Sequence, residues 1–180
     1  AIGFSALTSN TSGASNTVVG RSAMSTNTTG ACNVAIGQNA LLQNTEGNTN
    51  VAVGRFALDN NTTADSNTAV GYESLGANTT GANNTAVGFD SLKANTTGCL
   101  NVAVGKSALC TNTTGCTNTA IGRDAMLANT TGDFNVAVGH EALDSNTTAN
   151  ENTAIGAASL AANTTGSQLT AIGKDSLKDN

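Results

Sequence analysis

Apolar and polar positions recur along this chain with a fixed period of 17 residues. Glycine returns at every seventeenth position from Gly3 to Gly173 without an insertion or a deletion, so the chain holds eleven copies of one unit. The copy at 84–98 has the sequence NTAVGFDSLKANTTG. Such a short and regular period predicts a solenoid, in which each unit forms one coil and packs only against its neighbours. We therefore expect residues 1–180 to be a single repeat array.

Each copy contains one segment with the composition of a short β-strand. The residues at 84–88, Asn-Thr-Ala-Val-Gly, include β-branched side chains and a glycine that would end the strand. The next segment, for example 123–128, has helix-forming residues but is too short for a stable helix, so we expect a single helical turn or a second strand. Asn-Thr-Thr-Gly is typical of a turn. The predicted fold class is an all-β or β-rich solenoid.

Two slots of the unit are apolar in every copy, and we predict that both form the core. One slot holds Val or Ile before the first glycine, and the other holds Leu or Met four residues after it. All seven basic residues fall in two other slots, which we expect to face solvent. The predicted core includes Val53, Val70, Val87, Val104, Ile121, Leu58, Leu75, Leu92 and Leu109.

Two columns of asparagine also follow the period. One precedes Thr-Thr-Gly and never varies as far as Asn180, and the other runs from Asn16 to Asn152 before Leu169 interrupts it. An amide stacked on its own copy can donate to one neighbour and accept from the other, so a buried ladder would satisfy itself. The alternative is a set of solvent-facing turn asparagines. The predicted structural ladder contains Asn10, Asn27, Asn44, Asn61, Asn78, Asn95, Asn112, Asn129, Asn146 and Asn163.

The composition limits the classes of partner. The net charge is −5 and the basic residues are scattered, so we do not expect binding to nucleic acid. No stretch approaches 18 consecutive apolar residues, so no membrane insertion is expected either. Two large apolar side chains per coil make a thin core. We therefore predict a parallel homotrimer, with the Val/Ile slot facing a common axis.

Candidate chemistry is sparse. We find no nucleophile elbow, phosphate loop or metal-spaced His/Cys cluster, and we predict no enzymatic activity, no cofactor and no metal site. His140 shares its slot with Arg123 and Phe89, which indicates a surface variant. Cys99 and Cys116 lie one period apart and would stack on adjacent coils within disulfide reach. Either they form a disulfide or cysteine is a small filler in this slot.

The Asn-Thr-Ala-Val/Ile-Gly element, repeated along the whole chain, resembles the Val-Ala-Ile-Gly repeats of trimeric autotransporter adhesin heads. The full unit with Ala-Leu and Asn-Thr-Thr-Gly is similar to repeat arrays in bacteriophage tail-fibre-like and bacterial surface proteins. The resemblance implies a trimeric β-roll that is extracellular, on a cell surface or on a virion tail fibre, and that acts in attachment. The unit is longer than those of the adhesin heads.

These observations favour a structural shaft or stalk segment of a fibre. The chain starts and stops inside a repeat, so we expect it to be an excerpt of a longer fibre, whose other domains would bind a host-surface receptor. One alternative is an ice-binding β-solenoid, because the threonine column from Thr11 to Thr164 could order water. Another is a self-assembling extracellular matrix filament.

Overall fold

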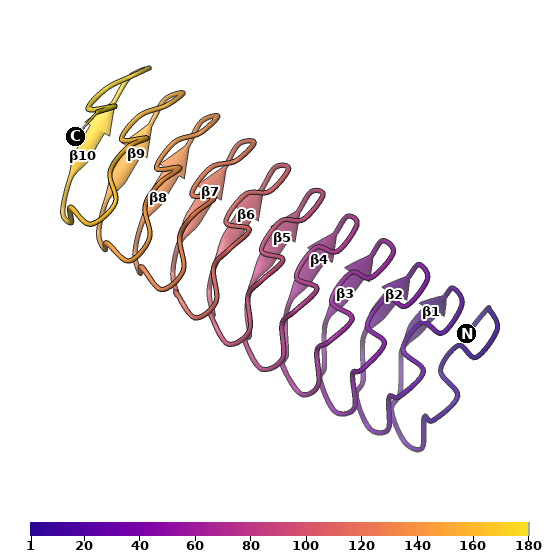
Figure 1. Ribbon diagram of the computed structural model, residues 1–180. Helices are drawn as coiled ribbons and strands as arrows, with labels where there is room; N and C mark the ends of the chain where they lie inside the picture. Colours follow the sequence, from indigo (N-terminus) through magenta and orange to yellow (C-terminus); the bar gives the residue numbers. More distant parts are fainter. Residues whose placement is uncertain (180) are drawn as a thin grey trace.

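The computed structural model describes residues 1–179 as a stack of coils (Figure 1), and Asn180 lies outside the described residues. Every coil after the first contributes one strand of three residues, and the ten strands form a single parallel sheet in chain order. In the first coil, Ile2 forms only an isolated bridge to Val19. Strand partners are one period apart, so that Val87 pairs with Val104. The β-solenoid predicted from the period is confirmed. The strands are β1 (Thr17–Val19), β2 (Val34–Ile36), β3 (Val51–Val53), β4 (Thr68–Val70), β5 (Thr85–Val87), β6 (Val102–Val104), β7 (Thr119–Ile121), β8 (Val136–Val138), β9 (Thr153–Ile155) and β10 (Thr170–Ile172).

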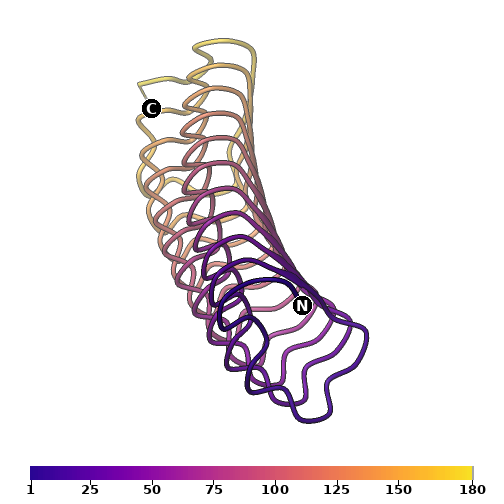
Figure 2. The ribbon, with the colours of Figure 1, turned by 90° about the vertical axis from the view of Figure 1, so that its right-hand side faces the viewer.

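The segment after each strand is neither a helical turn nor a second strand. It is a run of turns in which two residues per coil adopt a left-handed conformation, for example Asp90 at φ 56° and Leu92 at φ 50°. These kinks turn alternate amides toward other coils: Asp90 donates to the Tyr72 carbonyl of the preceding coil at 3.0 Å, whereas Leu92 and Ala94 donate to the Ala108 and Cys110 carbonyls of the next coil at 3.0 and 2.9 Å. Bonds within one coil also occur, from Ser91 to the Gly88 carbonyl at 3.4 Å and from Asn95 to the Leu92 carbonyl at 3.2 Å, but they alternate with bonds to other coils and form no continuous helical series. Seen from the side, the coils follow one another along a gently curved stack (Figure 2).

The glycine after each strand is required for two reasons. Gly88 has φ 138°, a conformation that L side chains rarely adopt. A Cβ at this position would lie 2.4 Å from the carbonyl oxygen of Gly105 in the next coil. The backbones of neighbouring coils therefore touch here, which explains why the slot is glycine in every copy.

The core differs from the prediction in one of its two slots. The Leu/Met slot is inside, and Leu58, Leu75, Leu92 and Leu109 are fully buried. The Val/Ile slot is not inside: Val53 and Val70 are half-buried, and Val87, Val104 and Ile121 are 36–40% exposed. The prediction of a Val/Ile core within the chain is wrong.

Side-chain alternation explains this difference. In a strand, neighbouring side chains point to opposite faces, so only the central residue of each three-residue strand faces inward. That residue is Ala in nine strands and Val18 in β1, and it is buried in all of them. These small side chains pack against the leucine column in one continuous cluster. The β-branched residues that flank the central position therefore project outward.

Candidate functional site

The most extensive polar feature is the asparagine ladder of the Asn-Thr-Thr turn. The Nδ2 of Asn112 donates to Oδ1 of Asn95 at 2.8 Å and to the Gly115 carbonyl at 3.0 Å. In turn, Nδ2 of Asn129 donates to Oδ1 of Asn112 at 2.9 Å. The same link joins each successive pair of predicted ladder residues, Asn10, Asn27, Asn44, Asn61, Asn78, Asn95, Asn112, Asn129, Asn146 and Asn163. All of them are buried except Asn10, which is half-buried.

The second asparagine column is also ordered, but it works through the backbone. Asn118 donates its backbone N–H to Oδ1 of Asn101 at 2.9 Å, and its Nδ2 donates to the Gly132 carbonyl at 2.8 Å. Leu169, which interrupts the column, still donates its backbone N–H to Oδ1 of Asn152 at 2.9 Å. Each side chain therefore bonds through Nδ2 to a backbone carbonyl of its own repeat unit and through Oδ1 to a backbone N–H of the following coil.

Threonine forms two columns with different roles. In the first, from Thr11 to Thr147, the hydroxyl bonds to the backbone of the next coil, as when Thr113 Oγ1 donates to the Thr130 carbonyl at 3.0 Å. The threonine that follows it in the turn is exposed in every coil from Thr63 to Thr165. Only the second column presents its side chains freely to water.

The structure brings two of the four cysteines together. The sulfurs of Cys99 and Cys116 lie 2.8 Å apart, and the backbone N–H of Cys99 donates to Sγ of Cys116 at 3.0 Å. The hydrogen bond with Cys116 and partial burial raise the pKa of the Cys99 thiol to about 11. Both residues are half-buried thiols.

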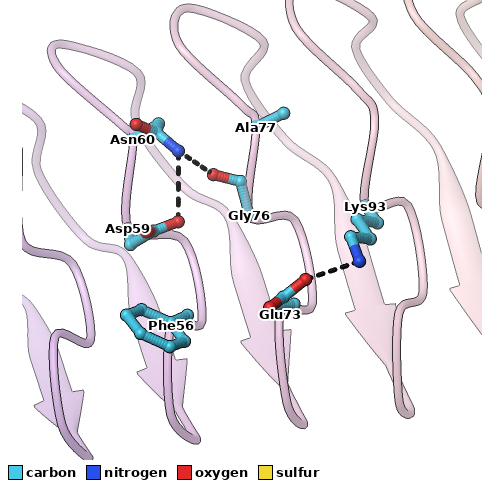
Figure 3. A pocket seen from close by; sticks show the side chains of 7 residues that line it. All are labelled: Phe56, Asp59, Asn60, Glu73, Gly76, Ala77 and Lys93. Atoms are coloured by element: carbon cyan, nitrogen blue, oxygen red, sulfur yellow. Dashed lines mark hydrogen bonds and ion pairs between the residues drawn. The ribbon is translucent and has the colours of Figure 1, made fainter.

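A surface hollow of about 320 Å³ lies beside Gly76 (Figure 3). Gly76 occupies the slot directly after leucine, where Asp59 and Lys93 stand in the flanking coils, so its missing side chain leaves the space open. The Phe56 ring closes one side, and Asn60 donates to the Gly76 carbonyl at 2.7 Å across the rim. The sequence did not lead us to this hollow. The one available signal was that Gly76 alone lies outside the two glycine slots.

The charges around the hollow are largely paired. Lys93 Nζ lies 2.5 Å from Glu73 Oε2, and this hydrogen bond lowers the pKa of Glu73. Asp59 has no cationic partner of this kind, and burial, assisted by the nearby Glu73 charge, raises its pKa to about 6. The hollow therefore carries one carboxyl group that prefers its protonated form at mildly acidic pH.

Aromatic side chains continue from the hollow across neighbouring coils. Phe56 meets Tyr72 edge to face with ring centroids 6.2 Å apart, and Tyr72 stacks on Phe89 at 5.3 Å. The Arg55 guanidinium lies 4.6 Å from the centre of the Phe56 ring. These contacts are favourable local packing on the surface, worth on the order of 1 kcal/mol each.

His140 belongs to a charged surface group. One ring nitrogen of His140 and one carboxylate oxygen each of Asp124 and Glu141 lie within 4.8 Å of one another. The Arg123 guanidinium shares this position: it bonds to His140 Nε2 and lies 3.2 Å from Asp124 Oδ2 and 3.7 Å from Glu141 Oε1. Because a fixed cation already sits among these groups, the arrangement is a surface ion-pair network.

Within residues 1–179 there is no helix whose length and apolar character would let it cross a membrane. Comparisons with protein-family models, with curated proteins and with solved structures returned no match.

Proposed function

We propose that this chain is a structural shaft segment of an extracellular or virion fibre, and that domains elsewhere in the fibre bind the receptor. The observation that carries the proposal is the unbroken axial register from β1 to β10. The coils between the two ends repeat the same pattern of backbone bonds with one buried leucine or methionine and one buried asparagine, so adding a coil changes the length and leaves the cross-section unchanged. Such an array is a spacer of defined length.

The hydrogen bonding also favours stiffness. Backbone bonds link neighbouring coils at the strand, along the turns and in the Asn-Thr-Thr segment. Both asparagine columns add links of 2.8 to 3.4 Å between neighbouring coils along the same axis. Bending the stack would stretch several of these bonds at once, so the stack should resist bending. Resistance to bending is the property that a fibre shaft needs.

We further propose that the shaft is a parallel homotrimer. The strands contain only Thr, Val, Ala and Ile, so the outer face of the sheet carries no charge. The exposed column on this face includes Val87, Val104 and Ile121. Contiguous apolar surface of this kind favours protein contact. Three copies around a common axis would cover it.

Light scattering tests the assembly. We expect a particle of three times 17.7 kDa, and a 17.7 kDa monomer at micromolar concentration would contradict the trimer.

Electron microscopy of the rods tests the role as a spacer. Two additional 17-residue units inserted in register should lengthen the rod by about 10 Å. A Gly/Ser insertion of the same length after Thr97 serves as the control, because it forms no coil. If both insertions leave the rod length unchanged, the chain does not act as an axial spacer.

Ice binding is the second candidate, and the exposed threonine column from Thr63 to Thr165 favours it. Its members repeat at the coil spacing of about 4.8 Å. The neighbouring column is less suited, since hydroxyls such as that of Thr113 are bonded to backbone carbonyls. A freezing gap measured by thermal hysteresis, lost in a variant with Thr97, Thr114 and Thr131 changed to Ala, would support ice binding over the shaft.

A further inference from the structure

One column of side chains in this solenoid points back along the stack. The column follows the second glycine slot and contains Asn48, Asp65, Ala82, Cys99, Cys116, Asp133, Asn150 and Ser167 in successive coils. Its polar members accept a hydrogen bond from the backbone N–H one coil earlier. Asp133 Oδ1 accepts from Cys116 at 2.6 Å, and Asn150 Oδ1 accepts from Asp133 at 2.7 Å. Side chains in this column are thus directed at the preceding coil.

The side chain of Cys116 also points toward the preceding coil, where the same position is Cys99. Its Sγ accepts the backbone N–H of Cys99 at 3.0 Å and lies 2.8 Å from the Cys99 sulfur. A disulfide requires Cα atoms about 4.4–6.8 Å apart, and the spacing of about 4.8 Å between paired coils meets that condition. The column therefore holds the two sulfurs together before any bond forms.

The other two cysteines have no such neighbour. Cys110 stands between Lys93 and Leu127 in its column, and Cys32 stands between Ser15 and Thr49. Of the disulfide pairings that four cysteines allow, the arrangement therefore favours only Cys99 with Cys116.

We propose that Cys99 and Cys116 are an oxidation site, and that a small-molecule disulfide converts them into an intrachain bond that staples two adjacent coils. With glutathione disulfide as oxidant, the two thiols give up two electrons and two protons and the Cys99–Cys116 bond forms. The bond in glutathione disulfide breaks and two glutathione thiols leave. Both protein thiols are half-buried rather than enclosed, so such an oxidant can reach them.

The bond would close a ring of one coil. Cross-linking residues one period apart restricts the unfolded chain while leaving the folded positions nearly unchanged. We expect the oxidised protein to unfold at a higher temperature than the reduced protein, with the difference abolished by dithiothreitol. The inference does not depend on the shaft role, because it concerns only two neighbouring coils.

Peptide mapping after incubation of the full chain with glutathione disulfide tests the proposal. The protein is then denatured, its free thiols are blocked and it is cleaved with trypsin. Cleavage after Lys93, Lys106 and Arg123 places Cys99 in peptide 94–106 and Cys116 in peptide 107–123. We expect these peptides to be joined in the monomeric chain, and the number of free thiols to fall from four to two.

Two variants separate the alternatives. Peptide 107–123 also contains Cys110, so Cys110→Ser must keep the cross-link and Cys116→Ser must lose it. In Cys116→Ser we also expect the shift in unfolding temperature on oxidation to disappear. Peptides that remain separate, a link that requires Cys110, or cross-links only between chains would each overturn the proposal.

Discussion

The side-chain amide of Asn112 donates to Oδ1 of Asn95 at 2.8 Å, while its own Oδ1 accepts from Asn129 at 2.9 Å. A single side chain therefore satisfies groups in three successive coils without contacting water, because all three residues are fully buried. Since each asparagine both donates and accepts, only a residue with both functions can continue the ladder.

Replacing Asn112 should show this dependence directly. Asn112→Ala leaves a buried donor and a buried acceptor unpaired, and we expect the free energy of unfolding to fall by about 1 to 3 kcal/mol. Asn112→Asp should cost at least as much, since a carboxylate cannot donate and would be buried as a charge. Urea unfolding measures both. The exposed Thr114→Ala is the control and should change stability by less than about 0.5 kcal/mol. An Asn112→Asp protein as stable as the parent would contradict the ladder's structural role.

The two glycine slots should respond differently to alanine. Gly88→Ala combines an unfavourable φ of 138° with a Cβ only 2.4 Å from the Gly105 carbonyl oxygen, so we expect a loss of several kcal/mol. A Cβ at Gly98 would also be close to its neighbours, at 2.4 Å from Asn95 Oδ1. Other coils nevertheless accommodate Ala64 and Ala149 in that slot, both buried. Gly98→Ala should therefore cost on the order of 1 kcal/mol. Equal midpoints in thermal unfolding would show that the strand-ending glycine has no special constraint.

Charge placed at adjacent strand positions should distinguish the inner face of the sheet from the outer face. Ala86 is completely buried and Val87 is 36% exposed. Ala86→Asp should destabilise the chain by several kcal/mol because an unpaired carboxylate would enter the core. Val87→Asp should change the unfolding free energy of the single chain by less than about 1 kcal/mol but prevent trimer formation. Chemical unfolding of dilute protein and light scattering measure the two effects. Similar unfolding losses in both variants would contradict the assignment of the faces.

Asp59 should make the stability depend on pH. Its folded-state pKa is about 6 and its reference value is 3.8, so between these values the folded chain retains a proton that the unfolded chain has released. Stability must then fall as the pH rises through this window. Asp59→Asn removes the ionisation and should stabilise the protein above pH 6 by about 1 kcal/mol, after allowing for the partial exposure of the group. Urea unfolding of parent and variant at pH 4 and pH 7 measures the difference. A difference in unfolding free energy between variant and parent that is no larger at pH 7 than at pH 4 would contradict the burial of this carboxyl group.

Regular spacing made much of the fold predictable. One slot that is glycine in all eleven copies implies one repeated backbone geometry, and the strand before it follows from its β-branched residues. The buried leucine column and the link between Asn95 and Asn112 also follow from slot identity, because a side chain that never varies in kind occupies a constant environment. The hollow at Gly76 was harder to foresee. It depends on which side chains flank a missing one in the two adjacent coils.

What the amino-acid sequence determined by itself is therefore the one-dimensional part of the protein: the period, the register and the partners that meet one coil away. The tertiary structure alone decided which way the side chains of the strands point. Val87 is as apolar as a core residue, yet alternation in a three-residue strand turns it outward and gives the interior to Ala86. The left-handed residues Asp90 and Leu92 likewise exclude the helical turn that local composition allowed, because alternate amides of this segment donate to neighbouring coils. Local propensity is weak in so short a segment, and the stacked coils override it.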